Sequence, residues 1–177
     1  MNQLRGTPLQ RFLRDWRRAH PPRHDLVLVL QSVAYTVNVG SLFRIADGVN
    51  ASAVYLCGIT PAPPNKTISK VGRNKDRDVR WEKRDTAEEV IAELRADGYH
   101  IVALEITDEA QPYYAPDYPQ KVALVLGNED HGVTRAALAL CETSVFVPML
   151  GKGKSLNVHI SAAVALYHIA HQHQMNE

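Results

Sequence analysis

The chain is poor in cysteine and lacks long apolar runs. Cys57 and Cys141 are its only cysteines, and they lie too far apart to resemble a zinc-ligand motif. We interpret them as two buried thiols in a reducing compartment. No apolar run approaches the roughly 20 residues that a membrane-spanning helix needs. The N-terminus starts with polar and basic residues instead of an apolar signal core, so we expect a cytoplasmic protein.

Standard nucleotide-binding and metal-binding motifs are also missing. Residues 151–155 resemble the end of a phosphate-binding loop, but that motif needs a glycine where Pro148 stands. No Gly-x-Gly-x-x-Gly follows the first apolar run, which argues against a standard dinucleotide-binding fold. Three histidines near the end lack a carboxylate or cysteine at ligand spacing: His168, His171 and His173. We therefore predict no metal site.

Positive charge is concentrated in one half of the chain. Residues 1–84 contain 15 Lys+Arg and 6 Asp+Glu, whereas residues 85–177 contain 5 and 13. The halves thus differ strongly although the net charge is only +1. Two basic clusters, at residues 11–23 and 66–84, argue against full mixing of these charges in space. We expect a polyanion partner, most commonly a nucleic acid.

Strand-like and helix-like segments alternate along the chain. Runs of β-branched and apolar residues predict strands at 26–31, 53–56, 100–106, 122–126 and 145–147. Helical spacing predicts helices near 38–49, 86–96, 134–140 and 156–171. Asn38 is the predicted N-cap of the first of these helices and Ser155 that of the last. Residues 61–84 show little periodicity beyond a possible helical turn or two and are predicted to form a long functional loop. The alternation predicts an α/β fold: a mainly parallel sheet with helices on both faces.

The first residues form a unit of their own in this prediction. Residues 1–24 contain an amphipathic helix that starts at Thr7-Pro8 and ends before His20-Pro21-Pro22. Its apolar face should dock on something while its arginines face outward. The remaining residues, 25–177, form one domain, as expected for a chain of 177 residues.

Three loops follow three different strands and carry similar polar residues. They span residues 38–44, 127–132 and 148–157. Turn and cap chemistry explains each loop taken singly, because glycine, asparagine and serine are common there. Their joint occurrence is harder to explain in that way, since loops at the carboxyl ends of parallel strands meet at one edge of the sheet. That edge is where α/β proteins bind small ligands.

The same segments resemble a known family. NVGSLFRIADG (38–48), LVLGNEDHGV (124–133) and VPMLGKGKSLNVHISAAVALY (147–167) are similar to the three motifs of the SpoU, or TrmH-type, RNA ribose 2′-O-methyltransferases of the SPOUT superfamily. The resemblance runs in order from about Asp25 to Ala170, and its third motif is highly specific. It implies a deep C-terminal trefoil knot, S-adenosyl-L-methionine bound by the knotted loops, and a homodimer with the active site near the subunit interface.

The resemblance also implies roles for individual residues. Arg44 corresponds to an arginine that helps to deprotonate the ribose hydroxyl or holds the adjacent phosphate. Because free arginine has a pKa above about 12, we interpret it mainly as an electrostatic and positioning group. Asn38 corresponds to the residue that orients this arginine. Glu129 matches the motif-two glutamate, and Ser155 and Asn157 match the polar pair of motif three.

The cofactor and the RNA are assigned to separate sets of residues. The resemblance implies that backbone groups around four residues, with a neighbouring strand end, cradle S-adenosyl-L-methionine: Gly127, Val147, Met149 and Leu156, with Leu104. We expect six basic residues to bind RNA phosphates: Arg11, Arg14, Arg18, Lys66, Arg73 and Lys75. Methyl transfer from a sulfonium needs no metal and no covalent nucleophile, which fits a chain that shows neither.

The leading hypothesis is therefore methylation of a ribose 2′-hydroxyl in structured RNA. The compact build favours tRNA over rRNA. Two alternatives stay open: a base-nitrogen RNA methyltransferase on the same scaffold, and a catalytically silent RNA-binding protein. His159 departs from the family pattern, which usually has a small residue there. It either faces a neighbouring helix, the simpler interpretation, or alters the dimer contact or substrate choice.

Overall fold

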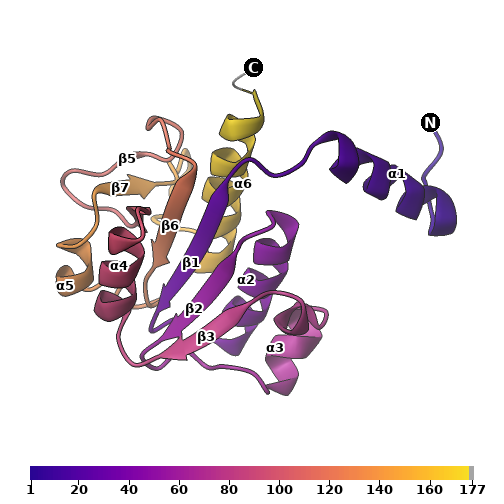
Figure 1. The fold of residues 1–177 in the computed structure, drawn as a ribbon. Coiled ribbons are helices and arrows are strands. Elements are labelled where there is room, and N and C mark those ends of the chain that lie inside the picture. Colours follow the sequence, from indigo (N-terminus) through magenta and orange to yellow (C-terminus); the bar gives the residue numbers. More distant parts are fainter. Residues whose placement is uncertain (176–177) are drawn as a thin grey trace.

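A parallel sheet forms the centre of the protein (Figure 1). The computed structural model describes the backbone of residues 1–175 and the side chains of residues 1–172. Its strands lie in the order β3-β2-β1-β6-β4-β7-β5, and each neighbouring pair is parallel. The strands are β1 (Asp25–Gln31), β2 (Ala53–Cys57), β3 (Trp81–Arg84), β4 (His100–Leu104), β5 (Gln111–Pro112), β6 (Lys121–Leu126) and β7 (Thr143–Phe146).

Helices cover both faces of this sheet. Alternate residues of the central strand β1 enter different cores: Leu28 packs with side chains of α2, α3 and α6, and Val29 with those of α4 and α5. The helices are α2 (Thr36–Gly48), α3 (Lys66–Val71), α4 (Ala87–Ala96), α5 (Arg135–Leu138) and α6 (Val158–Met175). The predicted α/β fold with a mainly parallel sheet is therefore confirmed. The knot stays a prediction, because strand order and register do not determine which segment passes through which loop.

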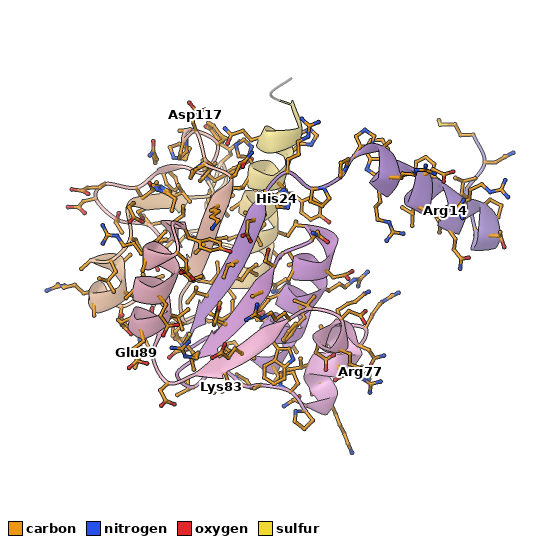
Figure 2. The ribbon with its side chains drawn as sticks, in the orientation of Figure 1. Arg14, His24, Arg77, Lys83, Glu89 and Asp117 are labelled. Atoms are coloured by element: carbon orange, nitrogen blue, oxygen red, sulfur yellow. The ribbon has the colours of Figure 1, made fainter. Side chains whose placement is uncertain are left out.

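The N-terminal helix α1 (Gly6–Ala19) extends away from the sheet and its helices (Figure 1). None of its residues is buried, and Arg14 lies far from the body of the protein in Figure 2. The prediction that its apolar face docks is not met within residues 1–175, since Phe12 and Trp16 remain 52% and 54% exposed. The proposed boundary between residues 24 and 25 stays a prediction, and residues 176–177 of that second unit lie outside the described chain.

The prediction that residues 61–84 form a long loop is wrong, although the helical turn or two that it allowed are present. This segment contains α3, the short 3-10 helix η1 (Lys75–Arg77) and the edge strand β3. Helix α3 is too short to show periodicity, although Asn65 caps it by accepting hydrogen bonds from the Thr67 and Ile68 backbone N–H groups at 2.9 and 3.2 Å. Strand β3 has the charged, half-exposed sequence typical of an edge strand, which hides it from a search for apolar runs.

The two predicted capping residues are also wrong. Asn38 lies inside α2, which begins at Thr36, and α6 begins at Val158, after Ser155. The carboxylate of Glu129 instead accepts the backbone N–H groups of Ala34 and Tyr35, just before α2, at 2.8 and 3.2 Å. A carboxylate from another loop thus stabilises this helix N-terminus, as the helix dipole favours. The Asn38 side chain is therefore available for other contacts.

Candidate functional site: a pocket at the carboxyl ends of the strands

A cavity of about 960 Å³ lies at the edge of the sheet where β4, β6 and β7 end. Its walls come from segments far apart in the sequence: residues 104–107, 127–133, 146–147 and 154–158, together with Tyr35, Val37, Asn38, Leu138 and Ser161. Such a volume suits a ligand of nucleoside size. Its place agrees with the rule that ligands of open α/β sheets bind at the carboxyl ends of strands.

The wall formed by residues 127–133 is closely packed. A Cβ atom at Gly127 would overlap the backbone of Gly132 and Val133, so only glycine fits there. Across the loop, the backbone groups of Asn128 and Gly132 exchange hydrogen bonds of 3.1 and 2.8 Å. The Asn128 side chain accepts hydrogen bonds from Asp130 and His131 and donates one to the Ser32 carbonyl. The loop is therefore held in one shape before any ligand binds.

Glu105 supports the same loop from the end of β4. Its carboxylate accepts hydrogen bonds from the backbone N–H groups of Ile106 and Val133, each at 2.9 Å. Neither Glu105 nor Asn128 was expected from the sequence to have a function. The sequence could have indicated Glu105, because an acidic residue directly after a buried strand lies at the ligand-binding edge of the sheet.

A chain of three polar side chains crosses one side of the pocket. Asn38 Nδ2 donates to Glu129 Oε1 at 2.6 Å, and Asn38 Oδ1 lies 2.8 Å from His159 Nδ1. His159 therefore faces the neighbouring helix α2, as the simpler interpretation of the sequence has it. The residue that it meets there is one of the candidate catalytic residues.

Burial and hydrogen bonding act in opposite directions on Glu129. Burial raises the pKa of its carboxyl group, but hydrogen bonds from Ala34, Asn38 and Tyr35 lower it by more, so the pKa lies below its ordinary value. Glu129 is therefore ionised at neutral pH. Burial lowers the pKa of His159, which favours the uncharged ring.

The loop of residues 147–156, which also contributes to the lining, makes no polar contacts with the rest of the described chain. From Val147 to Leu156, no backbone or side-chain group forms a hydrogen bond or ion pair with any other residue in the described part of the chain. Leu104, Phe146 and Leu156 add apolar surface to the lining. Unused backbone donors and acceptors beside apolar side chains suit the adenosine and methionine parts of S-adenosyl-L-methionine.

The structure brings most, though not all, of the expected site residues together. Eight line the pocket: Asn38, Glu129, Ser155, Asn157, Leu104, Gly127, Val147 and Leu156. Met149 lies in the same loop without lining the cavity, and its methyl group lies 3.3 Å from where a Cβ atom at Gly153 would stand. Arg44 is exposed on α2 outside the lining of its own chain's pocket. It lies seven residues after the pocket residue Val37, so it shares that helix face about 10 Å farther along.

The expected RNA-binding residues lie in two places. Arg11, Arg14 and Arg18 are exposed on α1, and Lys66 and Arg73 are exposed around α3. Figure 2 shows Arg77 beside α3, on a part of the protein distant from α1. Lys75 is engaged within the chain, because its ammonium group forms ion pairs with Asp47 and Asp78 at 3.1 and 2.9 Å. Five of the six residues thus present unneutralised or weakly paired charge to solvent.

The described residues contain neither a cluster of metal ligands nor a membrane-spanning helix. Among the described residues, no three His, Cys, Asp or Glu side chains converge as metal ligands, and the side chain of His173 lies outside this range. No described helix is both long enough and apolar enough to span a membrane. Cys57 is buried and Cys141 half-buried, and burial raises the pKa of each thiol to about 12.

Comparison with known proteins identifies the family. The chain is 29% identical over 150 residues to the tRNA (guanosine(18)-2′-O)-methyltransferase of Escherichia coli (strain K12), covering 85% of this chain and 65% of that protein. It is 32% identical over 148 residues to the 23S rRNA (guanosine-2′-O-)-methyltransferase RlmB of Ralstonia nicotianae, covering 83% and 59%. The chain thus spans less than two thirds of the length of these relatives.

A solved structure and a family sequence model indicate the same family of RNA methyltransferases. The AdoMet-bound rRNA methyltransferase from Sinorhizobium meliloti superposes with a TM-score of 0.78 at 25% identity, covering 86% of this chain and 58% of that one. The sequence model of the SpoU rRNA Methylase family matches residues 25–167, which include all three motifs. The resemblance seen in the sequence is therefore confirmed, and the chain belongs to the SpoU family.

Proposed function

We propose that this protein transfers a methyl group from S-adenosyl-L-methionine to a ribose 2′-hydroxyl in structured RNA, with tRNA favoured over rRNA. The observation that carries the proposal is the pocket, where motif residues Asn38, Glu129 and Asn157 converge beside a loop with unused backbone groups. Family membership and relatives named for ribose methylation of tRNA and rRNA support it. A cytoplasmic location, where such RNA is found, belongs to the same proposal.

The chemistry assigns different tasks to the two walls of the pocket. When bound, S-adenosyl-L-methionine supplies the sulfonium methyl group. The backbone of residues 147–156 with Leu104 and Gly127 holds this cofactor, and Ser155 and Asn157 face the reacting end. In the transfer that this cofactor would supply, the 2′-oxygen would take the methyl carbon as the carbon–sulfur bond breaks, the thioether would be the leaving group, and the hydroxyl proton would pass to water. The polar side chains of Glu129 and Asn38 orient the ribose, so that its hydroxyl is aligned for transfer.

Arg44 is proposed to act in a homodimer. Several apolar side chains are exposed on α2 and α6, including Val37 at 50%, Ile160 at 41% and Tyr167 at 55%. An exposed apolar face of this kind favours contact with a second copy of the chain. Because Arg44 does not line its own pocket, we propose that it stabilises the reacting hydroxyl and phosphate at the partner's pocket. The exposed basic residues of α1 and the α3 region would neutralise RNA phosphates.

Methylation of tRNA and rRNA fragments with labelled cofactor tests the function. The wild-type protein should produce label in nucleotides that resist alkaline cleavage, because a methylated 2′-oxygen cannot attack the adjacent phosphate. Label at alkali-sensitive nucleotides would instead indicate base methylation. Absence of cofactor binding by calorimetry would indicate a silent RNA-binding protein.

The Arg44→Ala variant sharpens this assay. We expect turnover to fall at least about 100-fold, the usual effect of removing one electrostatic group at a reacting centre, while the Kd for cofactor stays unchanged. Arg95→Ala is the matched control, because Arg95 lies on α4, on the other face of the sheet. Equal loss of turnover and cofactor binding in Arg44→Ala would mean that Arg44 serves the fold and not the reaction.

A further inference from the structure

The ring of His159 lies at the start of α6, directly against the candidate catalytic amide of Asn38. Asn38 is only 8% exposed, and His159 is half-buried. A small residue at position 159 would leave the Asn38 oxygen without this partner. The contact is therefore specific to a chain that carries histidine here.

The chemistry of Glu129 determines which way the Asn38 amide points. An ionised carboxylate only accepts hydrogen bonds, so the Asn38 group 2.6 Å from Glu129 Oε1 must be the NH₂ group. The oxygen of the amide then faces His159, and an oxygen can only accept. His159 Nδ1, at 2.8 Å, must therefore carry a proton.

We propose that His159 is a positioning residue whose Nδ1–H group holds the Asn38 amide in one orientation, with its NH₂ group facing Glu129 and the pocket. One N–H of this group is used by Glu129, and no described residue accepts the other. That second N–H is left to bind a ligand atom in the pocket. The kinetic consequence rests on the proposed methyltransferase function, whereas the hydrogen-bond arrangement does not.

The arrangement also separates positioning from proton transfer. Nδ1 carries a proton both in this neutral tautomer and in the charged ring, so the bond to Asn38 persists in either state. If the ring instead removed a proton from the substrate, its basic nitrogen would be essential. A side chain that donates from the position of Nδ1 but has no basic nitrogen distinguishes the two roles.

The tautomer can be measured on the protein alone. Two-dimensional ¹H–¹⁵N NMR of the imidazole rings, assigned by loss of the His159 signals in a variant, should show the Nδ1–H form at neutral pH. The Nε2–H form, which is preferred by free histidine, would overturn the proposal. This measurement needs no RNA and no cofactor, so it stands even if the proposed function fails.

Substitutions test the kinetic consequence. His159→Asn places an amide N–H near the position of Nδ1 and should keep kcat within about threefold of wild type. His159→Leu has no donor and should lower kcat about tenfold with little change in KM for RNA, the effect of losing one hydrogen bond. His171→Leu, an exposed position on the same helix, is the control.

Two outcomes of this series would contradict the positioning role. One is His159→Asn impaired as strongly as His159→Leu, and the other is His159→Leu as active as wild type. Thermal unfolding of each variant shows whether it is folded, and the tautomer measurement decides if His159→Leu does not fold. A wild-type protein without methyltransferase activity would refute the proposed function instead of the hydrogen-bond arrangement.

Discussion

Two loops contribute to the lining of the pocket, and they are built in opposite ways. The closed loop, residues 127–133, has its backbone tied by Asn128 and Glu105 and allows only glycine at position 127. In the open loop, residues 148–157, no group before Asn157 forms a hydrogen bond with another residue of the described chain, and Leu150 is fully exposed. Both carry family motifs, so the difference does not reflect a difference in functional importance.

The comparison shows how the pocket divides stability from ligand binding. Many polar groups of the closed loop form hydrogen bonds within the protein, so the shape of this loop depends on the fold and not on a ligand. Polar groups of the open loop are left for solvent or a ligand, and a ligand that binds them must also order them. Changes in the closed loop should therefore lower the stability of the protein, and changes in the open loop should act mainly on binding.

The largest effect should come from a matched pair of glycine substitutions. In Gly127→Ala the new methyl group overlaps the backbone of Gly132 and Val133, so we expect a loss of about 3 kcal/mol of unfolding free energy. In Gly151→Ala the methyl group meets nothing within 4 Å, so stability should change by less than about 0.5 kcal/mol. Urea unfolding of both variants measures this. Equal losses would abolish the distinction between the loops.

A smaller effect is expected for Glu129→Gln. The amide cannot replace a carboxylate that accepts three N–H groups, so unfolding free energy should fall by about 2 kcal/mol at pH 7. Because folding lowers the pKa of Glu129, the difference from wild type should be complete above about pH 5. It should shrink as the pH falls below about 4 and the carboxylate becomes protonated.

Unfolding of wild type and variant across pH 3 to 7 measures that difference. Glu89→Gln provides the control, because Glu89 is exposed on α4, as Figure 2 shows, and should change stability by less than about 0.5 kcal/mol. A gap between wild type and Glu129→Gln that stays constant down to pH 3 would mean that ionisation of Glu129 does not stabilise the closed loop.

The sequence was sufficient for the parallel sheet, because its central strands are continuous apolar runs such as residues 26–31. It was insufficient for β3, in which three of four residues are charged and none is buried, and for α3, which has only six residues. Periodicity needs length and burial contrast, and these elements have neither. The same limit explains why residues 61–84 were predicted to be a loop.

For the candidate site, motifs located the pocket but not its hydrogen bonds. Glu129, Asn38 and His159 are separated by up to 121 residues along the chain. They touch only because the fold packs α2 against α6 and places the loop after β6 beside α2. Local sequence rules predicted that Asn38 caps the helix. The backbone N–H groups just before α2 are instead bonded by the carboxylate of Glu129, which comes from another loop. Arg44 shows a further limit. Its motif is intact, yet it lies outside the lining of its own chain's pocket, so the role proposed for it depends on the proposed homodimer.

The open loop offers the most sensitive test of ligand ordering. Lys152 and Lys154 are exposed in it, so trypsin should cleave there in the free protein. If S-adenosyl-L-methionine binds this loop, a concentration about ten times its Kd should slow that cleavage about tenfold, because only the unbound fraction is cut. Mass spectrometry distinguishes these sites from cleavage at the exposed arginines of α1, which serves as an internal control and should not change. Slower cleavage at both places would mean a general inhibition of the protease. An unchanged rate at Lys152 and Lys154 would remove the open loop from the cofactor site and leave the closed loop as the only wall that the cofactor contacts.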